Sequence, residues 1–130
     1  MALVAINKKN MNFNEYYWHD SVITNLTIDR TNPGISDTIS LEIILQEGGD
    51  IELIFEDVYW ANLALNFGIR AKENILHAFM AEKNDEDLTN LYLRWKGYID
   101  NIDLTCYVFD LNSTGGKIKI IAKGFKVRYS

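Results

Sequence analysis

The chain has 130 residues, the length of one ordinary domain, so we expect a single domain over residues 1–130. Hydrophobic residues make up 48% and charged residues 24%, which excludes a disordered chain. No apolar stretch approaches the ~20 residues of a membrane-spanning helix. The apolar start at residues 1–6 has its positive charges after it, unlike a signal peptide, so we expect a cytoplasmic protein.

The net charge of −5 is unevenly distributed along the chain. Residues 117–130 carry 5 bases and no acid, whereas residues 1–116 hold 8 bases against 18 acids, a balance of −10. An acidic body disfavours nucleic acid and favours a basic protein partner, although the same charges also suit a solvated surface. Cys106 is the one cysteine, which excludes an internal disulfide and a CxxC pair.

The first half of the chain predicts an arm followed by hairpins. Residues 1–20, rich in Asn and aromatics, predict an N-terminal arm or short helix that leads into the fold. Residues 21–58 then alternate between apolar and polar side chains in three runs. Turn sequences separate the runs, with Pro33-Gly34 in the first and Gly48-Gly49 in the second. We therefore predict a three-stranded antiparallel meander.

The middle of the chain favours a helix. Ile69, Ile75, Leu76, Phe79 and Met80 fall on one stripe at helical spacing, which predicts an amphipathic helix over residues 70–83. The polar run at residues 84–87 ends it. Residues 88–99 fit both a helix and a strand, and we favour the strand.

The last third predicts two strands, at residues 104–111 and 117–129, joined by a turn that contains Gly115-Gly116. In the last strand the apolar residues change parity at Lys123-Gly124, which predicts a β-bulge at Gly124. The sequence thus predicts an α+β fold: a mainly antiparallel sheet of about five or six strands, with one amphipathic helix packed on it.

Residues 18–21, Trp-His-Asp-Ser, bring three catalytic residue types together. In an extended chain, His19 and Ser21 lie about two residue rises apart and Asp20 points to the other face. A triad needs a nucleophile–base contact near ~3 Å, which consecutive residues rarely supply. We therefore interpret the segment as the turn into the first strand and assign no catalytic residue.

Other candidate chemistry is weak. His19 and His77 fall in no metal-binding pattern, so we expect no metal site and no cofactor. Cys106 has the setting of a core residue rather than a nucleophile. Lys117, Lys119 and Lys123 share one face of the last strand, which fits either nucleic-acid binding or an edge strand that lysines protect.

A protein-binding face is the alternative to catalysis. Aromatic anchors with charged rims form interface hot spots, and aromatic and acidic residues cluster in two segments of this chain. Any binding site would draw on Trp18, His19, Asp20, Glu56, Asp57, Tyr59 and Trp60.

Two stretches carry a family resemblance. Residues 18–23, WHDSVI, resemble the His-Asp-Ser opening of the first strand in several families of small bacterial proteins, most of them uncharacterised. Residues 112–125, NSTGGKIKIIAKGF, are similar to the C-terminal hairpin of such proteins. Some members are taken to be immunity proteins of polymorphic toxins. The resemblance therefore implies a non-enzymatic inhibitor that binds a cognate toxin, commonly a basic nuclease.

We accordingly expect a non-enzymatic protein-binding domain, in the form of an immunity protein that neutralises a bacterial toxin. The alternative is a small-ligand-binding or enzymatic domain with a pocket near Trp18, His19 and Asp20. The sequence leaves both a monomer and a homodimer open, because a long last strand with a free edge could pair with a second copy.

Overall fold

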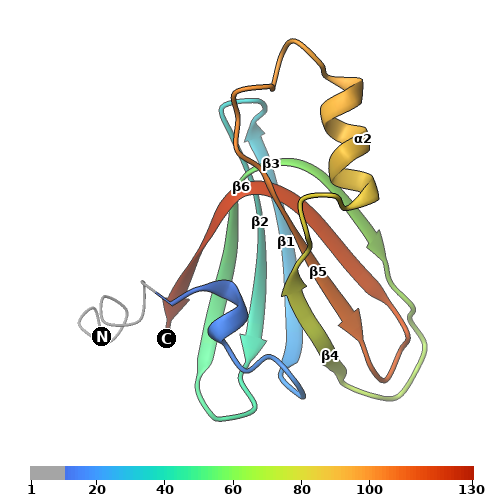
Figure 1. Ribbon diagram of the computed structural model, residues 1–130. Helices are drawn as coiled ribbons and strands as arrows, with labels where there is room; N and C mark the ends of the chain where they lie inside the picture. Colours follow the sequence, from blue (N-terminus) through green and yellow to red (C-terminus); the bar gives the residue numbers. More distant parts are fainter. Residues whose placement is uncertain (1–10) are drawn as a thin grey trace.

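The predicted meander is present as three strands: β1 (Val22–Asn32), β2 (Ser36–Ile44) and β3 (Asp50–Ala64). The computed structural model describes residues 11–130 (Figure 1). The bounds of β1 and β2 match the predicted meander, whereas β3 continues past its predicted end at residue 58. Antiparallel pairs join β1 to β2 from Val22↔Ile44 onward, and β2 to β3 from Thr38↔Glu56 to Ile44↔Asp50. The glycine pair of the second turn has positive φ at both positions, 105° and 93°, which explains why glycine stands there.

The helix predicted over residues 70–83 is wrong. Residues Glu73–Met80 form strand β4, which pairs with β5. A register shift between Ile75 and His77 adds one residue to β4, so that Ile75, Ala78 and Met80 pack on the interior while His77 and Phe79 face outward. Because of the extra residue, two successive inward-facing residues are three positions apart instead of two. This spacing also occurs on one face of a helix, so the sequence resembles an amphipathic helix.

The strand favoured for residues 88–99 is also wrong, because α2 (Glu86–Arg94) forms there. Asp85, part of the polar run that predicts the end of a helix, is instead the N-cap of α2, and its side chain accepts a hydrogen bond from the Leu88 amide at 3.1 Å. Glu86 and Asp87 occupy the first turn, where negative charge is stabilised by the helix dipole.

The two C-terminal strands are confirmed as β5 (Thr105–Leu111) and β6 (Lys117–Tyr129). The buried face of β6 changes parity between Ala122 and Phe125, as its sequence indicates. The register shift with its partner, however, lies in β3, between Val58 and Trp60, rather than at Gly124. Asp57, just before it, has a left-handed φ of 53°. The two strands therefore bend together.

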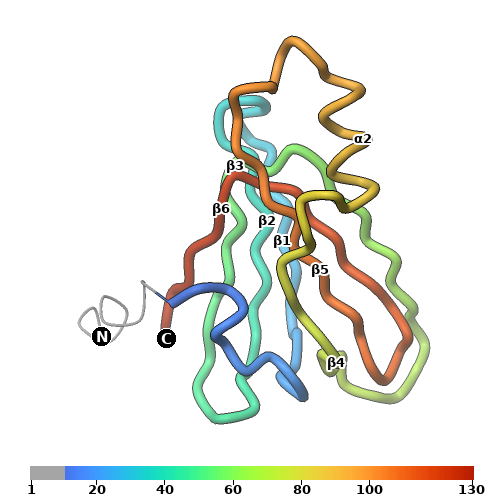
Figure 2. The backbone as a smooth tube through the Cα atoms, in the orientation of Figure 1, coloured from blue at the N-terminus to red at the C-terminus, as the bar shows by residue number. Residues whose placement is uncertain are grey.

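The six strands close a barrel in the order β1-β2-β3-β6-β5-β4. After its bend, β3 leaves β2, crosses the top of the barrel and descends beside β6, a path that the tube in Figure 2 makes clear. Closure between β1 and β4 rests on two residue pairs, Val22↔Asn74 and Ile23↔Glu73. The interior is filled by apolar side chains from all six strands. An α+β fold with an antiparallel sheet is thus confirmed.

The N-terminal arm closes the lower end of the barrel. A short 3-10 helix, η1 (Phe13–Glu15), places the Phe13 ring fully inside. Its ring centroid lies 5.0 to 6.4 Å from those of five other aromatic side chains, contributed by Trp18, Phe55, Tyr107, Phe109 and Phe125. Phe13 and Trp18, from the arm expected from the sequence, are therefore part of the core, and residues 1–10 lie outside the described part.

A second core lies outside the barrel, under α2. Leu88 and Leu91 of the helix pack against side chains that point outward from β5 and β6, among them Cys106 and Ile121. Trp60 of β3 borders the same cluster. No helix in the part of the chain that the structure describes is long and apolar enough to cross a membrane.

Candidate functional site

The turn at His19, Asp20 and Ser21 has a structural role, because it connects the N-terminal arm to β1 and is hydrogen-bonded to β4. Asp20 takes a left-handed φ of 63°, which Asp tolerates better than most residues. The amide of Asp20 donates to the carbonyl of Ile75 at 2.8 Å, and the amide of Ile75 donates to the carbonyl of Ser21 at 2.8 Å. These bonds fasten the turn to β4, next to the two residue pairs that close the barrel.

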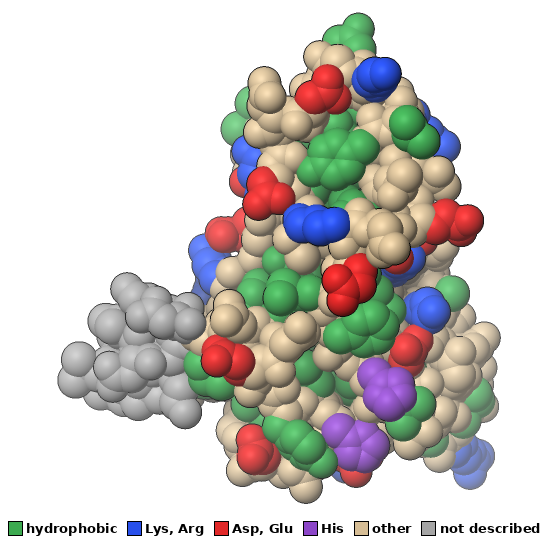
Figure 3. Space-filling model, in the orientation of Figure 1, with side chains coloured by type: hydrophobic (Ala, Val, Ile, Leu, Met, Phe, Trp, Pro, Cys, Tyr) green, Lys and Arg blue, Asp and Glu red, His purple; other side chains and the backbone are tan. Residues whose placement is uncertain are grey.

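The three side chains of this turn do not form a triad. The fully buried Ser21 hydroxyl oxygen accepts a hydrogen bond from the Gln46 amide at 3.0 Å, so it anchors the β2–β3 hairpin. His19 Nδ1 donates to the carbonyl of Leu76 at 3.0 Å, and its Nε2 lies 3.4 Å from Asp20 Oδ2. Both ring nitrogens of His19 thus have partners other than Ser21. Figure 3 shows both histidines on the same face, towards the lower end.

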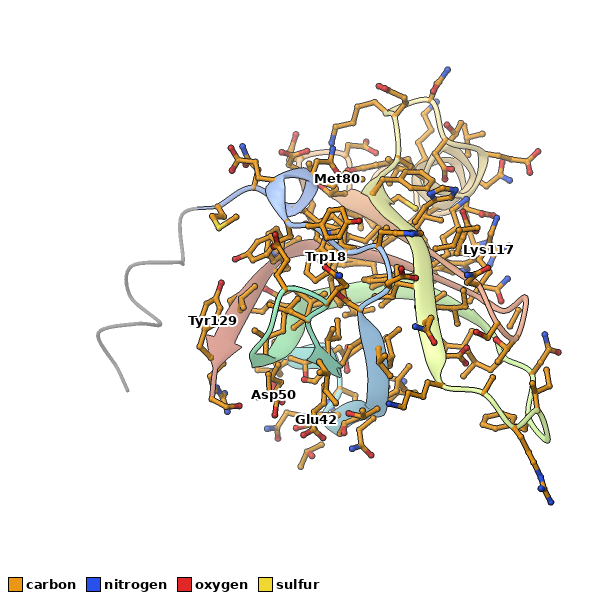
Figure 4. The ribbon with its side chains drawn as sticks, turned by 90° about the horizontal axis from the view of Figure 1, so that it is seen from below. Trp18, Glu42, Asp50, Met80, Lys117 and Tyr129 are labelled. Carbon is orange, nitrogen blue, oxygen red and sulfur yellow. The ribbon has the colours of Figure 1, made fainter. Side chains whose placement is uncertain are left out.

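Trp18 belongs to the plug, our name for residues 13–18, which close the lower end of the barrel, and not to a pocket. Its side chain is 3% exposed, its ring stacks on Tyr16, and its indole N–H donates to the carbonyl of Phe13 at 2.9 Å. In Figure 4, Trp18 lies in the middle of the barrel end, seen from below. A ligand could not reach Trp18 unless the arm moved.

Lys119 joins α2 to the barrel. Its Nζ lies 2.8 Å from Asp85 Oδ1 and 2.7 Å from Asp87 Oδ2, and only 17% of its side chain is exposed. Partial burial opposes ionisation of Asp85, but hydrogen bonds from Lys119 and the Leu88 amide outweigh it and lower the pKa of this carboxyl. Burial, reinforced by the negative charge of Asp85, raises the pKa of the Cys106 thiol to about 12. This cysteine is therefore an unreactive core residue, as its sequence setting predicts.

The lysines of the last strand form no free basic stripe. Lys119 is paired as described, and Lys117 Nζ lies 3.6 Å from Asp110 Oδ1. Residues Lys117–Ala122 pair with β5 on one side and with β3 on the other. The interpretation as protection for an edge strand is therefore wrong for Lys117 and Lys119, whereas Lys123 lies beyond the last residue pair between β5 and β6. No group of three or more metal-binding side chains lies together within residues 11–130.

The residues expected at a binding site are divided between the two ends of the molecule. His19 and Asp20 are exposed at the lower end, close to the β2–β3 hairpin. Asp57, Tyr59 and Trp60 lie at the β3 bend. Tyr59 is 39% exposed, and with Asp57 it lines a cavity of about 600 Å³. Glu56 forms an ion pair with Lys126 at 3.2 Å on the outer face of the barrel.

The lower end gathers five acidic side chains from separate parts of the chain. Two neighbouring hollows of about 440 and 470 Å³ share Tyr129 and lie on either side of the β2–β3 hairpin. In Figure 4, Glu42, Asp50 and Tyr129 lie around the same end of the barrel as Trp18. We name this surface the acidic end, and its charged and aromatic members are Glu15, Tyr16, Tyr17, Glu42, Glu47, Asp50, Glu52, Arg128 and Tyr129.

The acidic end combines charge with aromatic anchors. It holds five carboxylates and one guanidinium, and Arg128 is already paired with Glu52 at 3.1 Å. Tyr17 is 50% exposed, while the hydroxyls of Tyr16 and Tyr129 are 3.2 Å apart. The sequence reasoning missed this surface because η1, the β2–β3 hairpin and the end of β6 come together only in three dimensions. The carboxylates on both sides of Gly48-Gly49 were the available signal.

Comparisons with known proteins identify no relative of this chain. No protein-family model matches the chain, and no curated protein or solved structure matches it either.

Proposed function

We propose that this chain is a non-enzymatic protein-binding domain that contacts a basic partner protein through the acidic end. The observation that carries the proposal is the gathering of five carboxylates, one guanidinium and exposed tyrosine surface at one end of the barrel. Elsewhere among the described residues, five of the ten bases form ion pairs with acids, as at Lys119 and Lys126. The 13 acids and 10 bases there leave a balance of −3, compared with −4 on the smaller surface of the acidic end. The excess negative charge is therefore concentrated where a partner can reach it.

The chemistry of the acidic end suits a protein partner. Exposed carboxylates attract a basic protein over about one Debye length, ~8 Å at physiological salt, and thereby raise the rate of association. Tyrosine side chains supply contact area with little loss of conformational entropy. Tyr17 can serve in this way because half of its surface is exposed beside Glu47.

Within this proposal, the partner is a bacterial toxin domain and the chain is its cytoplasmic immunity protein. Support comes from the charge of the acidic end, which is complementary to a basic nuclease, and from the resemblance in residues 18–23 and 112–125. The alternative, a ligand pocket near Trp18, His19 and Asp20, has less support. Trp18 is buried in the plug, and the His19 ring is held by Leu76 and Asp20.

Co-expression tests the immunity proposal. The full chain is produced together with the toxin domain encoded by the neighbouring gene, and cell growth and complex formation are followed. We expect protected growth and a complex that survives size-exclusion chromatography at low salt. Growth arrest despite abundant soluble chain, or a genome with no toxin gene beside this one, would contradict the immunity proposal.

A further inference from the structure

One edge of β1 is left without a strand. On its other edge β1 pairs with β2 along its length, but the pairing with β4 stops at Ile23. Within residues 11–130, no strand pairs with this edge of β1 over residues 24–32. In an antiparallel strand, alternate residues point their N–H and C=O groups away from the partner, so several backbone groups here are free to bond.

The unpaired edge faces a groove rather than open solvent. Three cavities of about 510, 310 and 600 Å³ follow β1 from Ile23 through Ile28 to the turn at Gly34 and Ile35. Their opposite wall is the descending half of β3 and the β3–β4 loop, which includes Phe67. We name the space between β1 and this wall the edge groove.

Exposed apolar side chains concentrate along the edge groove. Of the eleven large hydrophobic side chains exposed in the described part of the chain, six line these cavities: Ile28, Ile35, Tyr59, Phe67, Ile69 and Trp95. Phe67 is 86% exposed and Ile28 is 54% exposed. Exposed apolar surface gathered in this way marks an interaction site.

The charges of the edge groove restrict its occupant. Three acids and two bases line the cavities, so they almost cancel. Arg30 Nε donates to Asp37 at 2.9 Å, and Glu73 accepts a hydrogen bond from the Thr114 hydroxyl at 2.6 Å. A segment with a net charge gains little attraction from a lining whose charges almost cancel, whereas an uncharged one leaves these two contacts intact.

We propose that the edge groove binds an extended, uncharged segment of a partner polypeptide, which adds as a strand to the free edge of β1. Strand addition satisfies the free backbone groups, and alternate apolar side chains of the segment pack against Ile28 and Phe67. A slender segment suits this space, because the descending half of β3 and the β3–β4 loop form a wall opposite β1. The edge groove shares Thr24 with one hollow of the acidic end but none of the charged or aromatic residues that define that surface, and the inference does not depend on the proposed function.

A displayed library of random twelve-residue peptides, selected on the full chain, tests the inference. We expect enriched peptides that alternate apolar and polar residues and lack charged ones. With the strongest one bound, hydrogen exchange should slow at alternate amides of residues 24–32. The double variant I28K/F67S should weaken its binding at least about tenfold. L93K/Y98S changes two side chains that are 65% and 83% exposed outside the groove and should bind as the wild type does.

The inference is overturned if selection enriches charged peptides or none. It is also overturned if amides 24–32 exchange equally fast with the peptide bound, or if I28K/F67S binds like L93K/Y98S. The wild-type chain could also prove to be a dimer in which these amides already exchange slowly. The edge groove would then bind a second copy of the chain, and the inference would be overturned. Peptide binding by the wild-type chain needs no variant to fold, so the exchange measurement stands by itself.

Discussion

Truncation of Phe13 to alanine tests whether the N-terminal arm is part of the core. The Phe13 side chain is fully buried, and its ring lies among five other aromatic rings at centroid distances of 5.0 to 6.4 Å. Phe→Ala in a packed core costs about 3–5 kcal/mol, because it removes apolar contacts and leaves a cavity. For a domain of this size, that loss lowers Tm by roughly 10–20 °C.

The assay is urea unfolding of F13A, followed by tryptophan fluorescence and by circular dichroism. The Trp18 ring is tilted by 33° against the Phe13 ring, with centroids 5.0 Å apart, so a red-shifted emission in the folded variant would show a loosened plug. Tyr17→Ala is the matched control, since it removes an aromatic side chain of the same segment that is 50% exposed. We expect it to cost below about 1 kcal/mol. If F13A costs no more than Y17A, the arm is not a structural plug.

Three further predictions follow from the contacts around the barrel. Lys119→Met leaves Asp85 and Asp87 without their cation and should cost about 1–3 kcal/mol, between the values for surface and buried pairs. Because pairing lowers the Asp85 pKa below its usual 3.8, its contribution is present above about pH 4 and is lost as pH falls through the lowered value. Acid titration of unfolding should therefore show a weaker pH dependence in K119M than in the wild type. The Cys106 thiol, with a pKa of about 12, should react with a thiol reagent at pH 8 at the rate of global unfolding, and fast labelling would contradict its burial. Ser21→Ala should cost about 1–3 kcal/mol because the Gln46 amide loses its acceptor, while exposed His19→Ala should cost under about 1 kcal/mol. The reverse order in thermal melts would contradict the structural role of this turn.

The alternation of apolar residues was a reliable guide to the position of most strands, even in β1, which has a register shift between Ile23 and Asn25, and in β6, which changes face. It predicted β1, β2, β5 and β6 closely, and the Gly48-Gly49 turn between β2 and β3. It failed at β4, where the extra residue between Ile75 and His77 changes the spacing. A sequence pattern cannot reveal such a bulge without knowledge of the partner strand, since the register is set by pairing with β5.

The sequence around α2 carries local signals of a helix start. Asp85 at the N-cap, followed by acids in the first turn and by Leu88 and Leu91 three residues apart, is typical of a helix start. The last strand shows the opposite limit. Its change of face was readable from sequence, but the register shift lies in β3, beside Asp57. The sequence of one strand does not determine which of two paired strands takes the extra residue, because this depends on the sequences of both strands.

The candidate site was harder to predict than the fold. The segment at residues 19–21, which resembles a catalytic triad in sequence, is a turn that connects structural elements. Its serine hydroxyl accepts a hydrogen bond from the neighbouring β2–β3 hairpin. The acidic end gathers Glu15, Glu47 and Tyr129 from three distant parts of the chain. No spacing rule connects such residues, because the closure of the barrel brings them together.

The most direct test of the proposed function is the dissociation constant of the complex with the toxin domain, measured by calorimetry for two charge-matched variants. E47Q/D50N removes two exposed carboxylates of the acidic end, and E82Q/E86Q removes two exposed carboxylates near the start of α2. Two exposed ion pairs are worth roughly 0.4–2 kcal/mol, so E47Q/D50N should raise Kd about 2- to 30-fold, with a weaker salt dependence. E82Q/E86Q should leave Kd unchanged. Equal effects of the two variants, or tight binding that E47Q/D50N does not alter, would contradict binding through the acidic end.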